Sequence, residues 1–170
     1  MSHRIHLLRH TKSSWDVADL RDHDRPLAPR GRRAAERLRS HLEAAGVAPQ
    51  LVLCSSATRA LQTGEGIRDG LPPETRVEVS GDLYDADAGS LLVRLNHLPE
   101  TVGSVLVIGH NPALEELALG LSGSGEDDAL GRMKAKYPTG GLATLTVDGT
   151  WAELSWQGAT LDDFVAPRDI

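Results

Sequence analysis

The run Leu51-Val52-Leu53-Cys54 contains no polar position that would face water from one side of a strand. The segment from Ser104 to Ile108 has the same apolar character, and Ile5-His6-Leu7-Leu8 is a short strand-like run at the start of the chain. Strands without polar alternation are typical of a sheet that is covered on both faces, and such sheets are mostly parallel. These three runs therefore predict the central strands of a parallel sheet.

Helical patterns separate these strands. Between Pro29 and Ala45, apolar residues recur at spacings of three and four, and Gly46 follows as a stop signal. Asn111-Pro112 predicts another helix start, with Asn as the N-cap and Pro at the first helical position. Two further helices and one strand are expected at Ala57 to Arg68, Ser90 to Leu98 and Arg76 to Val79. This order predicts an α/β fold, a single-domain three-layer sandwich with a mostly parallel central sheet and helices on both faces.

The last third of the chain changes character. Leu142 to Val147 and Trp151 to Trp156 are strand-like and flank Asp148-Gly149, a dipeptide that is typical of hairpin turns. We therefore expect a C-terminal hairpin. The polar, glycine-containing segment from Ser122 to Asp128 predicts a loop.

The length of 170 residues fits one domain, expected over residues 1–166 and followed by a loose tail at residues 167–170. The 18 basic and 24 acidic side chains give a net charge of −6, which argues against a nucleic-acid or anionic-membrane surface because both need a basic footprint. Cys54 is the only cysteine, so no intrachain disulfide can form, as expected in a reducing compartment. The chain has no signal-peptide pattern and no apolar run near the ~20 residues that span a bilayer, so the expected location is the cytoplasm.

Polar clusters follow each of the three apolar strands. Arg9 and His10 follow the first, Ser55 to Arg59 follows the second, and His110 follows the third. Each cluster alone is more often structural than functional, but ligands of open α/β sheets bind at the carboxyl ends of the strands. Because three strands deliver two arginines and two histidines to that edge, we expect them to form a shared anion site.

The residue types suit a phosphoryl group. A guanidinium offers a planar fork that matches phosphate oxygens, and helix N-termini near Ala57 and Asn111 add backbone donors. A neutral imidazole is a competent nucleophile, and its ordinary pKa of about 6.5 leaves much of it neutral at cytoplasmic pH. The cluster therefore predicts phosphoryl chemistry.

The segment from Leu8 to Trp15 resembles the opening motif of the histidine phosphatase (phosphoglycerate mutase-like) superfamily. That motif is usually Arg-His-Gly, and Thr11 replaces the glycine here, as in the short phosphohistidine phosphatases of SixA type. Further blocks resemble the same branch, in the same order along nearly the whole chain: Asp24-Arg25-Pro26-Leu27 followed by Gly31, Ser55 to Thr63, Gly109-His110-Asn111-Pro112 and Tyr137 to Gly141.

The resemblance implies a role for each matching residue. His10 would attack phosphorus and carry the phosphoryl group, and water would then hydrolyse phospho-His10. Arg9 and Arg59 would clamp the equatorial oxygens, and His110, cationic beside the phosphate, would stabilise the same charge. Because the positive charges come from the protein, the resemblance implies a phosphatase without a metal or other cofactor.

The proton donor and the substrate stay open at this stage. Leu83 to Gly89 fits the Leu-x-Glu-x-x-x-Gly pattern of ester-cleaving relatives, with Asp85 in place of Glu, but Asp85 fits a plain loop position equally well. An alkoxide leaving group needs a proton far more than an imidazole does, so a weak acid position favours phosphohistidine or another activated phosphate. Lys12, Ser13 and Asn111 are candidate substrate-binding residues.

The expected substrate is a phosphorylated protein or small molecule. Two alternatives remain, a small-molecule phosphatase or mutase that acts on phosphate esters, and a non-catalytic binder of phosphorylated ligands. The oligomeric state is not predicted.

Overall fold

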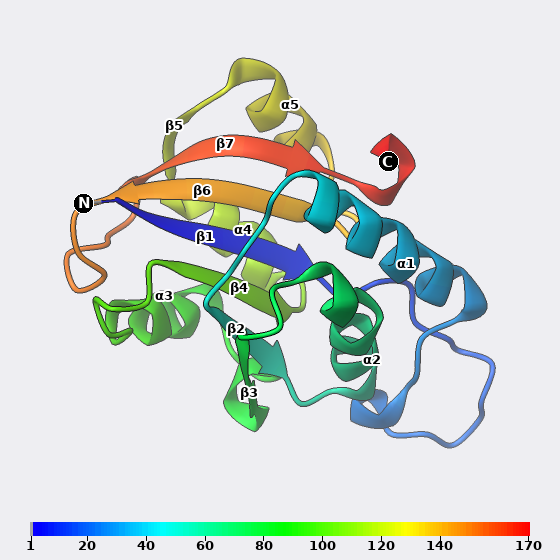
Figure 1. Cartoon of the computed structure of the whole chain (residues 1–170). Coiled ribbons are helices and arrows are strands. Elements are labelled where there is room, and N and C mark those ends of the chain that lie inside the picture. The colour runs from blue at the N-terminus through cyan, green and yellow to red at the C-terminus, as the bar shows by residue number, and fades with distance from the viewer. Residues whose placement is uncertain (1) are drawn as a thin grey trace.

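The computed structural model describes residues 2–170 and contains, over that range, a seven-stranded sheet in the order β3-β2-β4-β1-β6-β7-β5 (Figure 1). Only β6 runs antiparallel to its neighbours; the other pairs are parallel. The strands are β1 (Ser2–Arg9), β2 (Leu51–Ser55), β3 (Arg76–Ser80), β4 (Ser104–Gly109), β5 (Ser122–Gly125), β6 (Leu142–Asp148) and β7 (Ala159–Val165).

Helices cover both faces of this sheet, and they complete three layers (Figure 1). The helices are α1 (Pro29–Ala44), α2 (Thr58–Ile67), α3 (Ala88–Asn96), α4 (Ala113–Leu121) and α5 (Asp127–Ala135). One core lies under α1 and α2, and the other lies under α3, α4 and α5. The α/β three-layer architecture expected from the sequence is confirmed.

The central strands contribute to both cores, which is why they lack polar alternation. In β2, Leu51 and Leu53 pack into the core under α3 and α4, whereas Val52 and Cys54 pack into the core under α1 and α2. Successive strand residues point to opposite faces, so both sets must be apolar when both faces are covered.

The start of α4 differs from the expectation. The helix begins at Ala113 with Pro112 as the N-cap, so neither Asn111 nor Pro112 holds the position predicted for it. The Asn111 side chain is engaged elsewhere: its Nδ2 donates to the Tyr137 carbonyl at 3.1 Å, and its Oδ1 accepts from the Glu115 N–H at 3.3 Å. Asn111 therefore ties the helix to the loop before β6.

The C-terminal hairpin exists, but its second strand was wrongly placed. β6 pairs antiparallel with Ala159–Val165, and Trp151 to Trp156 forms turns. Trp151 leaves the sheet because its ring is fully buried against the α3 side, where its indole N–H donates to the Val102 carbonyl at 2.7 Å. Large apolar rings signal burial as readily as they signal a strand.

The prediction of a loop from Ser122 to Asp128 is also wrong, because this segment contains β5 and the first residues of α5. β5 pairs with β7, which lies far from it in the sequence, so the local residue pattern does not predict this pairing. Glu126 caps α5 by accepting hydrogen bonds from the N–H groups of Asp128 and Ala129. Further on, Pro167–Asp169 forms a short 3₁₀ turn, and Ile170 packs against the α1 core.

Gly31 in α1 holds the segment that follows His10. A Cβ on Gly31 would lie 2.0 Å from the Lys12 carbonyl oxygen, an oxygen that accepts the Ala28 N–H at 2.9 Å. We expect Gly31→Ala to destabilise the fold by about 1–3 kcal/mol through overpacking, measured by urea unfolding. Gly131→Ala in α5 is the matched control: its Cβ would meet nothing within 4 Å, so it should stabilise by up to about 1 kcal/mol. Equal effects of the two substitutions would contradict this role of Gly31.

Candidate active site

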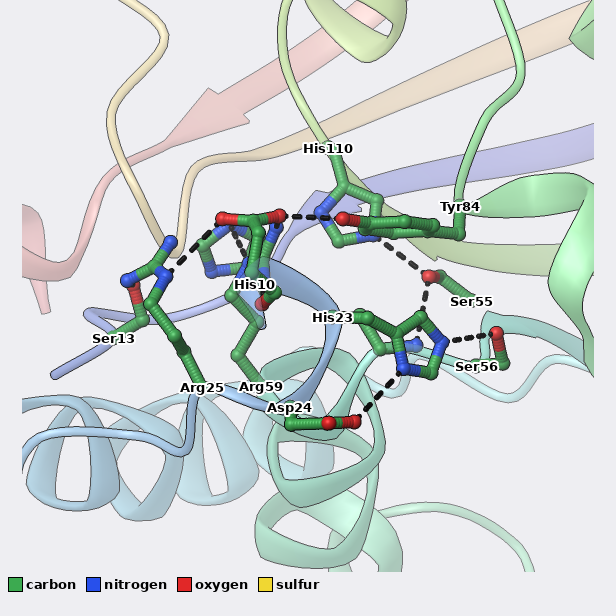
Figure 2. A network of polar contacts seen from close by, with 12 residues as sticks. His10, Ser13, His23, Asp24, Arg25, Ser55, Ser56, Arg59, Tyr84 and His110 are labelled. Carbon is green, nitrogen blue, oxygen red and sulfur yellow. Dashed lines mark hydrogen bonds and ion pairs between the residues drawn. The ribbon is translucent and has the colours of Figure 1, made fainter. Parts of the chain in front are cut away.

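Four side chains meet at the carboxyl edge of the sheet. Arg9 is the last residue of β1 and His10 follows it, while His110 follows β4 and Arg59 lies in the first turn of α2, just beyond β2. Figure 2 shows His10, Arg59 and His110 within one network of polar side chains. β4 lies between β1 and β2, so these three strand ends are adjacent. The structure therefore brings together the two arginines and two histidines that the sequence predicts to converge.

His10 is buried and presents one ring nitrogen to the cluster. Its Nδ1 lies 2.7 Å from the Thr11 carbonyl, and a carbonyl can only accept, so Nδ1 carries the proton. Its Nε2 is then an unprotonated acceptor, and Arg59 donates to it through Nε at 3.3 Å. The contact with Thr11 thus fixes the tautomer that leaves a lone pair on Nε2.

Burial keeps the His10 ring neutral. Desolvation lowers the pKa of His10 to about 3, against the smaller opposing effect of the Thr11 carbonyl, and the nearby His110, Arg59 and Arg9 lower it further. A neutral ring at physiological pH has a nucleophilic nitrogen.

His110 faces His10, with 5.2 Å between the ring centroids. Its Nε2 lies 2.7 Å from the Ser55 hydroxyl, which also accepts the Ala57 N–H. Nδ1 of His110 is buried and has no hydrogen-bond partner among residues 2–170. The two ring nitrogens of His110 therefore differ in their surroundings: Nε2 is hydrogen-bonded to Ser55, and Nδ1 is left without a protein partner in the described part of the chain.

Without a bound anion, the His110 ring is neutral; the cationic state that the resemblance implies applies beside phosphate and stays a prediction. Burial lowers the pKa of His110 to about 4, and Arg59 lowers it next, so the ring is neutral without a bound anion. An anion placed between the two rings would raise this pKa because it favours the protonated form.

Asp22 orients Arg59. The guanidinium donates through Nη1 to the Asp22 carbonyl at 2.7 Å and through Nη2 to the Asp22 carboxylate at 3.0 Å. Tyr84 donates its hydroxyl to the same carboxylate at 2.6 Å, and Arg25 pairs with the other carboxylate oxygen. Hydrogen bonds from Tyr84 and then Arg59 hold the pKa of Asp22 well below its usual range. With two of its nitrogens held by Asp22, the guanidinium turns Nε toward His10.

Arg9, which precedes His10 in the chain, is half-buried. Its Nη1 donates to the Tyr137 carbonyl at 3.0 Å, while its Nε is buried without a partner among the described residues. Burial lowers the pKa of Arg9, although an arginine stays charged at any physiological pH. Arg9 therefore brings a cation with unused donor capacity to the cluster.

The other predicted site residues have different surroundings. Asp85 is exposed, and no hydrogen bond or ion pair among residues 2–170 joins it to the cluster. Ser13 is buried and accepts a hydrogen bond from Arg25, whereas Lys12 is exposed. Asn111 makes the contacts with α4 and the Tyr137 carbonyl described above.

Sequence reasoning missed Asp22 and Tyr84. Asp22 stands two residues before the Asp24-Arg25-Pro26-Leu27 block, and Tyr84 lies inside the Leu83 to Gly89 block, next to the candidate acid Asp85. An acidic residue beside a matching block is the only signal that could have pointed to Asp22. Its contact with Arg59 spans 37 positions and depends on the tertiary fold.

Within residues 2–170, no group of three or more His, Cys, Asp or Glu side chains is arranged to hold a metal ion. In the same range, no helix combines the length and the apolar character that crossing a bilayer would require.

The lowered pKa values predict how the site rings titrate. Both His10 and His110 should stay neutral from pH 7 down to about pH 5, because each pKa lies well below the ordinary 6.5. The ring ¹³C shifts of the two histidines, followed by NMR against pH, measure this directly. A midpoint near 6.5 for His10 would contradict the proposed effect of burial.

Comparisons with known proteins agree with this geometry. Residues 5–97 match the model of the histidine phosphatase superfamily, branch 1. An uncharacterized protein of Mycobacterium tuberculosis is 40% identical over 163 residues, which cover 95% of this chain and 100% of that protein.

Solved structures with the same fold include SixA proteins. A proposed phosphohistidine phosphatase SixA from Nakamurella multipartitia is 28% identical with a TM-score of 0.82, covering 98% of this chain and 97% of that one. The protein histidine phosphatase SixA complexed with tungstate is also 28% identical, with a TM-score of 0.78 and 97% coverage of both chains. The cluster of two arginines and two histidines, the family match across more than half of the chain and these likenesses identify the chain as a member of the histidine phosphatase superfamily, branch 1, with a SixA-like structure.

Proposed function

We propose that this protein is a metal-independent phosphatase that hydrolyses its substrate through a phosphohistidine intermediate on His10, and that its substrate is a phosphohistidine protein or another activated small phosphate. The observation that carries the proposal is the pairing of an unprotonated His10 Nε2 with Arg59 Nε at 3.3 Å, opposite the His110 ring. A nucleophile and the donors for an anion thus share one buried site.

The first step is attack by His10 Nε2 on phosphorus. The N–P bond forms as the bond from phosphorus to the leaving group breaks, and the leaving group departs with the electron pair. Arg9 and Arg59 stabilise the charge on the phosphoryl oxygens, and His110 donates from Nδ1. In the second step, water attacks phospho-His10, which releases phosphate and restores the imidazole.

The leaving group decides which substrates react. No hydrogen bond or ion pair of the described residues joins Asp85 to the cluster, and the pKa of Asp22 is held too low for efficient proton donation near neutral pH. A substrate whose leaving group departs without strong acid assistance therefore fits the site best. Phosphoramidates such as phosphohistidine meet this condition, because imidazole has a pKa of only about 6.5.

A substrate panel tests the proposal. Turnover is measured with a phosphohistidine peptide, phosphoramidate, p-nitrophenyl phosphate and glycerol phosphate, each with and without EDTA. We expect the activated substrates to react about tenfold or more faster than the alkyl ester, because the alkoxide lacks a positioned acid. EDTA should have no effect. Faster cleavage of glycerol phosphate that Asp85→Asn removes would instead make this protein an ester phosphatase, and loss of activity in EDTA would make it a metal hydrolase.

We also propose that the protein acts in the cytoplasm, because its single cysteine, Cys54, is free and buried, as is common in a reducing compartment. Fractionation of cells that express the tagged full chain tests this location.

A further inference from the structure

A strongly basic cavity lies beside the reaction cluster. It has a volume of about 530 Å³ and is formed by the first half of α1, residues 136–139 and the turn at residues 166–168. None of its lining residues is acidic. Six of them are cationic: Arg9, Lys12, Arg30, Arg37, Lys136 and Arg168.

The six cations are not paired within the cavity, although Glu115 lies near enough to Arg9 to oppose the lowering of its pKa. None of the ion pairs among residues 2–170 includes any of them. The chain as a whole carries a net charge of −6, so the concentration of positive charge is local. Like charges that converge on one hollow repel each other, and a bound anion relieves that repulsion.

The cavity is tied to the reaction cluster through Arg9 and Lys12. Arg9 lines the cavity and also flanks His10, and its buried Nε has no partner among the described residues. Lys12 follows His10 by two positions. The cavity and the reaction cluster therefore share Arg9, and the residue two positions after His10 also lines the cavity.

We propose that this cavity binds a second phosphate group of the substrate, and that the substrate is a small molecule with more than one phosphate. This inference rests on the proposed phosphatase function. The volume lies within the range of small-molecule pockets, and arginine forks match phosphate oxygens. Arg30, Ala34 and Arg37 recur at spacings of four and three, so α1 presents both arginines on one face toward the cavity.

The test measures binding rather than turnover, so it is independent of whether His10 is the nucleophile. Calorimetry compares tripolyphosphate with orthophosphate as probes of the full-length protein. We expect tripolyphosphate to bind about tenfold or more tightly, and Arg30→Glu with Arg37→Glu to abolish this difference. Arg32→Glu with Arg33→Glu is the matched control: it makes the same charge change on the same exposed helix, at positions that do not line the cavity.

Three outcomes would overturn the inference. Equal affinity for the two probes would show that the cavity holds no second phosphate. An equal loss in the two double variants would attribute binding to overall charge. Tighter binding of an acidic phosphohistidine peptide than of tripolyphosphate, sensitive to Arg30→Glu with Arg37→Glu, would assign the cavity to a protein substrate. Failure of the phosphatase proposal itself would appear separately, as absence of turnover with every substrate of the panel.

Discussion

Replacing His10 with alanine is expected to reduce turnover of phosphoramidate by about ten-thousand-fold or more, because removal of a covalent nucleophile leaves only binding and electrostatic stabilisation. The reason lies in the geometry: Nδ1 is committed to the Thr11 carbonyl, and Nε2 is the only ring nitrogen left to attack. Turnover is measured as phosphate release under saturating substrate.

A covalent intermediate gives the same prediction a second measurement. The wild-type enzyme is mixed with ³²P-labelled substrate and the reaction is stopped rapidly without acid, because a phosphohistidine is acid-labile. The wild-type protein should carry the ³²P label, and the His10→Ala protein should not. His97→Ala is the control, because this exposed histidine on the end of α3 lies outside the cluster, and it should keep both turnover and labelling. Full labelling of His10→Ala would move the nucleophile to another residue.

Replacing Arg59 with alanine is expected to lower kcat by about 10²–10³-fold, the usual loss when one positioned donor to a transition-state oxyanion is removed. Arg59→Lys should recover only part of this loss, because an ammonium keeps the charge but not the planar fork that holds Asp22 and faces His10 together. Phosphate release at saturating substrate measures both variants, and thermal unfolding shows whether each one folds.

Asp22→Asn separates the two contacts of Arg59. It removes the charge that pairs with the guanidinium but leaves the donor that faces His10, so its kcat should fall less than that of Arg59→Ala. An equal loss in both variants would contradict this prediction, because it would mean that Arg59 contributes nothing to kcat once the Asp22 carboxylate no longer pairs with it.

The local sequence predicted most of the fold. Apolar runs such as Leu51 to Cys54 must be buried on both faces, and α1 shows its amphipathic spacing and its stop at Gly46 without any tertiary information. The mistakes fell where a distant partner decides the structure. β5 exists because it pairs with β7, and Trp151 turns away from the sheet because its indole finds the Val102 carbonyl.

The sequence by itself determined which residues reach the carboxyl edge of the sheet, because Arg9, His10 and His110 each end an apolar strand and such ends align in parallel sheets. Only the tertiary structure decided the tautomer and charge of the two rings, since both depend on burial and on single contacts with Thr11 and Ser55. It also decided that Asp22 holds Arg59 and that six cations surround one cavity. These groups lie on segments that are far apart in the sequence and come together only when the chain folds.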